Sequence, residues 1–417
     1  KQQLLTAFPN AADPQWRGWL ALALINRQTD SEMQRELVQW RTENPGHPAA
    51  NPLPGGLDYL LASSTQNGKV ALILPLSGQL AQAGKAVLDG FLAAHYADSS
   101  AGQATNELLV IDVGEFPSAS NAYGEALREG ASIVVGPLSK EALADLATRP
   151  ERPIPILALN RIDPILPAQG SALVQLSLAP EDEAISVAEL AFGRGARRAI
   201  IITPAGDWGS KVETALRERW GSLGGTIASN TTYSTYDDYS SSVTSALALD
   251  TSEQRASDLR TAIGINIEFT PRRRQDADAI FLLSHNGAEA RSIRPLLAFH
   301  YAGDLPVYAI SNIYNGIPDE RNQDLNGIQL VETPWLLGAN PDLLAALATG
   351  GVKSGNYTRL NALGADAYLV QSNFLRLQSG ADALMRGNTG LLSMDPTLSI
   401  KRQLSPATFD AGVLKAQ

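Results

Sequence analysis

The sequence contains no cysteine among its 417 residues. This absence excludes thiol catalysis, cysteine-ligated zinc sites, iron–sulfur clusters and disulfide bonds. Histidine is scarce, and no pair has the HExxH spacing of a metallohydrolase; the four histidines are His47, His95, His285 and His300. No apolar run approaches the roughly 20 residues that span a bilayer. We therefore predict no metal site and no membrane-crossing segment.

Positively charged residues are fewer than negatively charged ones. Lysine and arginine number 33 against 43 aspartates and glutamates, which gives a net charge of −10. Nucleic-acid binding needs a basic face that displaces counterions, so we predict no nucleic-acid partner. The chain starts at Lys1 and its first methionine is Met33. We expect a processed or truncated piece, with any signal or lipid-attachment segment lying upstream.

Catalytic motifs are missing as well. The sequence has no GxGxxG dinucleotide fingerprint, no GxSxG nucleophile elbow and no Ser-x-x-Lys pair. The segment from Gly78 to Ala86 imitates a phosphate-binding loop, but five residues separate its glycines where four are needed. Ala86 also replaces the hydroxyl residue that would hold Mg²⁺. We therefore predict no catalytic residue, no cofactor and no enzymatic activity.

Residues 1–50 differ in composition from the rest of the chain. They hold three of the six tryptophans, and apolar residues recur at helical spacing around Trp16–Leu24 and Met33–Trp40. Two helices with an N-cap at Asp30 or Ser31 fit this pattern. The pair is either a free-standing hairpin or the last unit of a tetratricopeptide-like array. A linker rich in proline and glycine follows over residues 51–68.

From Lys69 onward, apolar strands alternate with amphipathic helices. This rhythm predicts α/β class, with parallel sheets covered on both faces. The alternation restarts near residue 172, which predicts two lobes within a domain spanning residues 69–417. We assign lobe 1 to about 69–175 and 334–380, and lobe 2 to about 176–333 and 381–417. Ligands of such sheets bind beyond the carboxyl ends of the strands, so we expect a cleft between the lobes.

Loops at these strand ends supply the candidate ligand residues, which are Ser77, Gly78, Gly136, Ser139, Asn160, Asp207, Trp208, Ser284 and His285. Backbone N–H groups at helix starts can hold an anion. Ser77 and Ser139 can equally serve only as N-caps. Trp208 can stack on a ligand or fill the cleft wall, and His285 fits an ordinary loop residue.

A polar insertion from Asp250 to Asp276 interrupts the second lobe. It contains Arg255, Arg260 and the run Arg272, Arg273 and Arg274. Such a run is either a solvated loop or a positive surface that attracts an acidic partner. We predict the three consecutive arginines as a partner contact.

Several motifs together resemble known families. The Pro75–Gly78 loop with Gly84, the Gly136–Lys140 segment and the Gly364–Tyr368 helix resemble the type I periplasmic-binding-protein fold. Within that group, Val70–Gly78 and Leu157–Asn160, preceded by a helical hairpin, resemble the LppC family. That resemblance implies an outer-membrane lipoprotein that binds and activates a class A penicillin-binding protein, a peptidoglycan synthase. The lipid anchor would lie upstream of this chain, on the periplasmic side of the outer membrane.

Two functions from different classes remain open. The first is a non-enzymatic regulator that stimulates cell-wall synthesis through a surface contact with the synthase. The second is a periplasmic solute-binding protein for an amino acid or small anion, whose identity the sequence does not specify. The helical segment Trp16–Trp40 favours the regulator, because a transport binding protein would rarely carry one.

Overall fold

The computed structural model describes residues 8, 13–25, 30–50, 53–54, 68–102, 105–162, 169–170, 172–265, 268–353, 355–374, 377 and 384–417. Most of the predicted linker 51–68 lies outside these residues, as does much of the turn-rich stretch between Asn160 and Ser171. Contacts along the chain define two compact units. Unit 1 comprises Lys1–Ser177, Leu363–Gly387 and Leu391–Lys401, and unit 2 comprises Leu178–Ala362, Asn388–Gly390 and Arg402–Gln417.

The two N-terminal helices are α2 (Pro14–Ile25) and α3 (Asp30–Glu43), so the predicted helical pair is confirmed. They bury a small core; its members are Leu22, Ile25, Met33, Leu37, Trp40, Ala49, Ala50 and Leu53. The His47 ring contacts Trp19 and Trp40 edge-on, with centroids 5.3 and 5.1 Å away. Trp16 is 57% exposed, so it lies off the buried face that the spacing predicted. The predicted cap side chains Asp30 and Ser31 lie outside the described side chains.

Unit 1 contains an eight-stranded sheet in the order β13-β14-β15-β7-β5-β3-β1-β2. Its strands are β1 (Lys69–Leu74), β2 (Glu107–Asp112), β3 (Ala131–Val135), β5 (Ile156–Ala158), β7 (Leu173–Leu176), β13 (Met385–Arg386), β14 (Leu391–Met394) and β15 (Ser399–Gln403). The strands from β1 to β7 pair in parallel, as their continuous apolar runs predicted. A separate two-residue pairing joins β4 (Glu151–Arg152) to β6 (Gln169–Gly170).

Besides α2 and α3, the described helices of unit 1 are α5 (Ala81–Ser100), α6 (Ala119–Arg128), α7 (Lys140–Ala147) and α14 (Thr358–Ser372), whose last ten residues belong to it. Alternate residues of β1, Ala71 and Ile73, face the core that α6 and α7 close. On α14, a Cβ at Gly364 would lie 2.0 Å from the Val87 carbonyl oxygen of α5. Only glycine therefore allows these two helices to pack so closely.

Unit 2 contains a seven-stranded sheet in the order β17-β16-β12-β11-β10-β8-β9. Its strands are β8 (Arg198–Pro204), β9 (Thr226–Tyr233), β10 (Ala279–Leu282), β11 (Val307–Ala309), β12 (Gln329–Glu332), β16 (Ser405–Asp410) and β17 (Val413–Ala416). The first five pair in parallel, and β16 and β17 add antiparallel strands at one edge. The predicted pair of doubly wound sheets is thus confirmed, with mixed edges.

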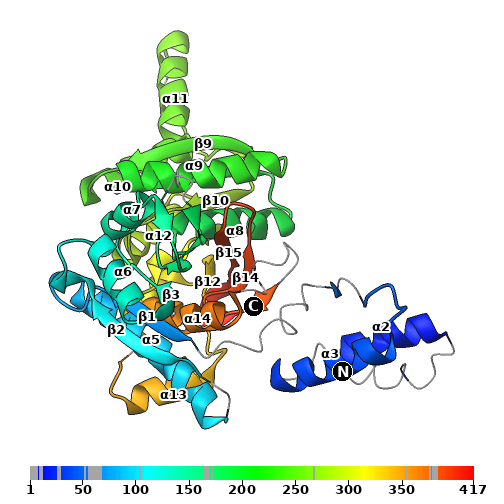
Figure 1. Ribbon diagram of the computed structural model, residues 1–417. Helices are drawn as coiled ribbons and strands as arrows, with labels where there is room; N and C mark the ends of the chain where they lie inside the picture. Colours follow the sequence, from blue (N-terminus) through cyan, green and yellow to red (C-terminus); the bar gives the residue numbers. More distant parts are fainter. Residues whose placement is uncertain are drawn as a thin grey trace. The chain divides into compact units, whose positions relative to one another are not determined.

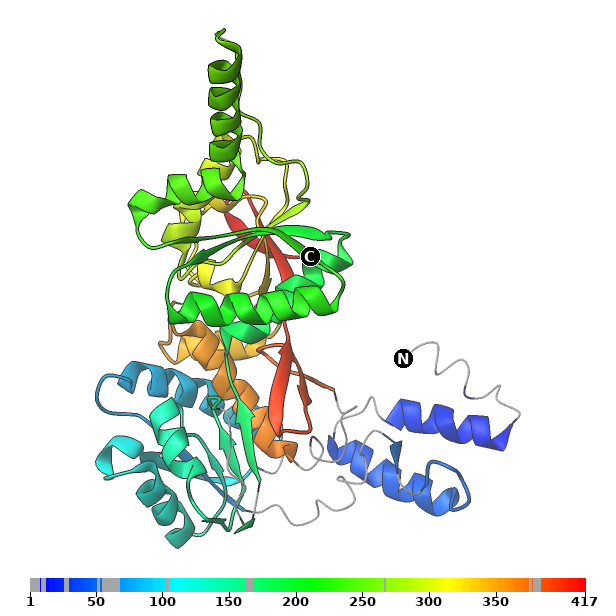
Figure 2. The same cartoon turned by 90° about the horizontal axis from the view of Figure 1, so that it is seen from above.

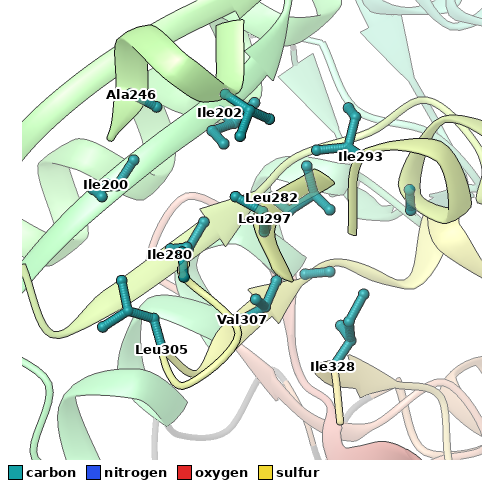
Figure 3. Packing of buried hydrophobic residues seen from close by; sticks show 14 of the residues in the cluster. Ile200, Ile202, Ala246, Ile280, Leu282, Ile293, Leu297, Leu305, Val307 and Ile328 are labelled. Atoms are coloured by element: carbon teal, nitrogen blue, oxygen red, sulfur yellow. The ribbon is translucent and has the colours of Figure 1, made fainter. Parts of the chain in front are cut away.

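The described helices of unit 2 include α8 (Pro180–Gly193), α9 (Asp207–Ser222), α10 (Tyr239–Ala246), α11 (Leu249–Ile263), α12 (Gly287–Phe299) and α13 (Pro341–Thr349). Helices α8 and α9 cover one face of the sheet, and α10 and α12 cover the other. Ile200 and Ile202 of β8 face a core shared with α10 and α12, part of which Figure 3 shows. Ile201, between them, faces the opposite core with α8 and α9. This alternation along a strand with two buried faces explains why β8 is apolar throughout.

The two units differ from the predicted lobes in two segments. Residues 334–362, which we assigned to lobe 1, belong to unit 2, whereas 381–387 and 391–401, assigned to lobe 2, belong to unit 1. Strand pairing explains the second difference. Ser399 of β15 pairs with Gln175 of β7, which ties the segment to the sheet of unit 1. Such long-range pairing leaves no local signal in the sequence.

The predicted polar insertion Asp250–Asp276 is largely helical. The α11 helix covers Leu249–Ile263 and ends at Gly264, whose φ of 66° is left-handed. Its buried residues, Leu249, Ser252 and Ala256, lie in its first turns. Figure 1 and Figure 2 show the rest of α11 extending away from β9 and α10. Leu259 and Ile263 on this outer part are about half exposed.

Candidate functional site

The loop after β1 is held by an aspartate that sequence reasoning missed. Asp112 ends β2, and its Oδ1 accepts the N–H groups of Leu76 at 2.9 Å and Gly114 at 3.0 Å. Ser77 also hydrogen-bonds to this carboxylate. Burial alone would raise the pKa of Asp112, but these hydrogen bonds outweigh it and hold the pKa below its ordinary value. The sequence feature that could have indicated this role was a carboxylate at the end of an otherwise apolar strand.

We expect Asp112→Asn to lower the free energy of unfolding by about 1–2 kcal/mol at pH 7, because a charged acceptor is lost. A carboxyl group with a depressed pKa stabilises the fold above the unfolded-state pKa of 3.8 and loses that contribution as pH falls. The variant should therefore lose less stability than the parent between pH 5 and about pH 3. Urea titrations across that range measure both effects. Equal pH dependence in the two proteins would contradict the prediction.

The other unit 1 candidates have structural partners. Ser139 caps α7, since its Oγ accepts the Ala142 N–H at 3.2 Å, so its capping role is confirmed. The same interpretation is wrong for Ser77, because α5 begins at Ala81 and Leu80 occupies the cap position. Asn160 donates from Nδ2 to the Leu138 carbonyl at 2.8 Å and joins two candidate loops.

The two candidate glycines take left-handed conformations. Gly136 has a φ of 113°, and a Cβ there would lie 2.1 Å from the Ile73 carbonyl oxygen. Gly78 has a φ of 72°, but a Cβ there would meet open space. Close packing therefore requires glycine at position 136, whereas backbone conformation alone favours it at position 78.

In unit 2, three aromatic side chains follow the carboxyl ends of neighbouring parallel strands. Trp208 follows β8, Tyr233 ends β9 and His285 follows β10. The Trp208 and His285 rings lie 4.7 Å apart with an interplanar angle of 37°. Trp208 is half-buried against the core beneath it, whereas His285 is exposed. The structure thus brings together two of the residues that the sequence singled out.

Glu289 connects this cluster, although the sequence analysis did not name it. Its Oε2 accepts the His285 backbone N–H at 2.9 Å and the Tyr233 hydroxyl at 2.7 Å. Its Oε1 lies 3.2 Å from His285 Nδ1. Burial raises the pKa of Tyr233, and the Glu289 carboxylate raises it further. The signal available in the sequence was the spacing of four residues between His285, which precedes α12, and Glu289 in the first turn of that helix.

The last two candidates differ in exposure. Ser284 is fully buried beside Tyr233, whereas Asp207 is exposed in the first turn of α9. A buried hydroxyl cannot meet a ligand from solvent without rearrangement, so Ser284 fits a supporting role. Ligand binding at the nine candidate residues, and a cleft shared by the two lobes, stay predictions.

The three consecutive arginines are not a free positive patch. Arg273 donates to Asp304 at 2.6 Å and to the Tyr301 carbonyl at 2.8 Å, and Arg274 pairs with Asp276 at 2.7 Å. Over residues 250–276, five arginines face five aspartates and glutamates, so the segment has no net charge. The predicted positive surface is therefore reduced to Arg272, which is exposed.

Unit 2 also buries a network of charged side chains. Arg359 donates from Nε to Glu332 Oε1 at 3.0 Å, and from Nη2 to the carbonyls of Ser311 at 3.0 Å and Tyr314 at 2.8 Å. Burial raises the pKa of nearby Glu183, while Arg359 and Arg402 lower it. Glu183 in turn accepts the Ser311 N–H at 2.9 Å. These contacts link α8, β12 and the start of α14.

In the described part of the chain, no three histidine, aspartate or glutamate side chains gather in a way that could hold a metal ion. None of the helices described there combines the length and apolar character needed to cross a bilayer.

This architecture of two α/β units is that of type I periplasmic-binding-protein-like proteins. A solved structure of a putative branched-chain amino acid ABC transporter from Chromobacterium violaceum covers 82% of this chain and 100% of its own, with a TM-score of 0.61 and 24% identity. Full-length LpoA from Haemophilus influenzae covers 99% of this chain and 72% of its own, with a TM-score of 0.67 and 24% identity. At these identities the similarity shows the fold.

The family follows from the sequence comparison. Residues 3–412 match the family described as LppC putative lipoprotein, and the chain belongs to that family. Curated relatives named penicillin-binding protein activator LpoA are 28% identical, over 402 residues in Photobacterium profundum and 410 residues in Vibrio cholerae. The alignments cover 94% and 96% of this chain, which spans only 65% and 67% of those relatives.

Proposed function

We propose that this chain is a non-enzymatic regulator that binds a class A penicillin-binding protein and stimulates peptidoglycan synthesis. The observation that carries the proposal is the family match over residues 3–412, together with relatives named as penicillin-binding protein activators. A solved LpoA C-domain from Haemophilus influenzae is likewise described as a regulator of PBP1A.

A non-enzymatic role is consistent with the chemistry of the chain. Cysteine is absent from the sequence. Within the described residues, the buried Ser284 hydroxyl near Glu289 has no hydrogen-bond partner that could act as a base. A protein without its own chemistry can raise another enzyme's rate by binding its active state more tightly than its inactive state. Regulation through a surface contact is therefore the mechanism we propose.

The lipoprotein family also supports a proposed location. We place the full-length protein on the periplasmic side of the outer membrane, held by a lipid anchor outside this chain. From there it would reach the synthase across the periplasm.

Reconstitution tests the proposed activity. The chain is added to a purified class A penicillin-binding protein with its lipid-linked disaccharide substrate, and glycan polymerisation and cross-linking are followed. We expect direct binding and faster synthesis. A solute-binding protein of the same fold serves as the control for nonspecific effects. Binding without any change in rate, or no binding at all, would overturn the proposal.

The contact prediction now centres on Arg272. We expect Arg272→Glu to weaken association with the synthase by about 2–5-fold and to reduce its salt dependence, as for an exposed charge at an interface rim. Arg321→Glu is the matched control, because it reverses another exposed unit 2 arginine, one paired with Asp319. Titrations at low and physiological salt measure the difference. Equal affinities for both variants would place the contact elsewhere.

A further inference from the structure

Two arginines of unit 1 lie around a buried tyrosine. Tyr123 on α6 is fully buried, and the Arg149 guanidinium carbon lies 4.9 Å from the centre of its ring. Arg152 on β4 is only 5% exposed and acts electrostatically on the same tyrosine. The two arginines are three residues apart in the segment that connects α7 to β5. Figure 1 shows α6 and α7, the two helices that frame this region.

The tyrosine hydroxyl is already satisfied. It donates to the Ile154 carbonyl at 2.8 Å and accepts the Ile154 N–H at 3.1 Å. One donor of Arg149, Nη1, bonds to the Ser120 carbonyl at 3.2 Å. These bonds fix the positions of Tyr123 and Arg149 and do not involve the Arg152 guanidinium.

Three buried guanidinium nitrogens in this group have no hydrogen-bond partner within the described residues: Nε and Nη1 of Arg152 and Nε of Arg149. Neither arginine forms an ion pair with a carboxylate in that same part of the chain. Burial lowers the pKa of Arg152, and only Tyr123 opposes this effect. A buried charge without a counterion is strongly unfavourable, so an unpaired guanidinium calls for an anion.

Other buried arginines show how this site differs. Arg402 in unit 2 also has unpartnered nitrogens, but it lies close enough to the Glu183 carboxylate to lower its pKa. Arg149 follows the end of α7, where the helix dipole favours a cation. Neither kind of compensation reaches Arg152, which makes it the centre of the site.

We propose that Arg149 and Arg152 bind a small oxyanion, a phosphate or a carboxylate. A guanidinium presents its N–H groups as a planar fork that matches two oxygens of such an anion. The unpartnered Nε of Arg152 shares one edge of the guanidinium with Nη2, and that edge can donate to two oxygens of one ligand. The site belongs to unit 1 alone and does not depend on the proposed synthase contact.

Thermal unfolding of the whole chain tests this site. Melting temperatures are measured against rising sodium phosphate, and separately sodium acetate, at constant ionic strength set with sodium chloride. Phosphate also stabilises proteins without a specific site, so the difference between the parent and Arg152→Gln is the readout. We expect the melting temperature of the parent to rise with the logarithm of the anion concentration, by roughly 5 °C or more at about 100 times Kd. Arg152→Gln and Arg149→Gln should lose it.

The control is Arg128→Gln, which removes an arginine of the same unit that pairs with Glu125 on the surface. This variant should keep the full anion response. A rise that depends on Arg152 with phosphate alone, or with acetate alone, identifies the ligand class. Equal responses in the parent and Arg152→Gln to both anions, including no response in either protein, would overturn the proposal. If Arg152→Gln does not fold, calorimetric titration of the parent protein with each anion tests the site instead. Absence of a binding site for phosphate and also for acetate would refute the proposal.

Discussion

We expect Arg359→Met to lower the free energy of unfolding by about 3–5 kcal/mol, the usual cost of removing one partner from a buried ion pair. The substitution leaves Glu332, which is fully buried, without its guanidinium partner. The Ser311 and Tyr314 carbonyls lose their donor as well. Urea unfolding of the whole chain, with hydrogen exchange to locate the change, measures the loss.

The loss of stability caused by Arg359→Met should depend on pH. Burial raises the pKa of Glu183, and Arg359 is the first group that counters the rise. In the variant, Glu183 holds its proton more tightly in the folded state than in the unfolded state. A group of this kind stabilises the fold below its unfolded pKa, and that contribution fades as pH rises. The penalty should therefore be smaller at pH 5 than at pH 8.

Two further variants separate charge from packing. The double substitution Arg359→Met with Glu332→Leu removes both charges, and we expect it to cost less than Arg359→Met alone. Arg321→Met breaks a surface ion pair with Asp319 and should leave the free energy of unfolding almost unchanged, because solvent screens exposed charges. Similar losses for Arg359→Met and Arg321→Met would contradict the view that the buried network stabilises unit 2.

Trp220→Ala should also cost about 3–5 kcal/mol, because a large side chain leaves a packed core. Trp220 on α9 is fully buried, and its ring lies 5.1 Å from that of Phe281 and 5.9 Å from that of Phe192. Its indole N–H donates to the Thr226 carbonyl at 3.0 Å. The Gly225 backbone packs directly against the indole. Denaturant unfolding monitored by circular dichroism measures the loss.

Trp16→Ala is the matched control, since Trp16 is 57% exposed on α2. We expect it to change stability by no more than about 0.5 kcal/mol. Trp220→Phe keeps most of the apolar volume but loses the hydrogen bond to Thr226, so its cost should fall between the two. A loss for Trp220→Ala as small as that for Trp16→Ala would show that the core refills the space.

Strands with two buried faces explain why much of the fold was predictable. Val70–Leu74 and Ala199–Thr203 are continuous apolar runs, and both are strands of parallel sheets. The helical structure of the insertion Asp250–Asp276 was harder to predict. Most of α11 faces solvent, and its polar composition is also typical of a loop. Its apolar residues Leu249, Ala256, Leu259 and Ile263 do recur at helical spacing, which was the missed signal.

The candidate site was predictable only in part. Trp208 and His285 follow strands that were recognised, so their meeting at one sheet edge followed from topology. Asp112 and Glu289 organise the loops around them, but their roles depend on groups from other segments. The pairing of Arg273 with Asp304 likewise joins residues 31 positions apart. Tertiary structure brings such partners together, so the local sequence does not predict them.

The strand order has a consequence for the timing of folding. Residues 385–403 supply β13, β14 and β15 to the sheet of unit 1, and residues 405–416 supply β16 and β17 to that of unit 2. Neither sheet can be completed until the last part of the chain has been synthesised. A cut near Ser177 would therefore release two fragments, the first of which lacks three strands of its own sheet. Each unit must be excised together with its distant C-terminal strands if it is to fold alone.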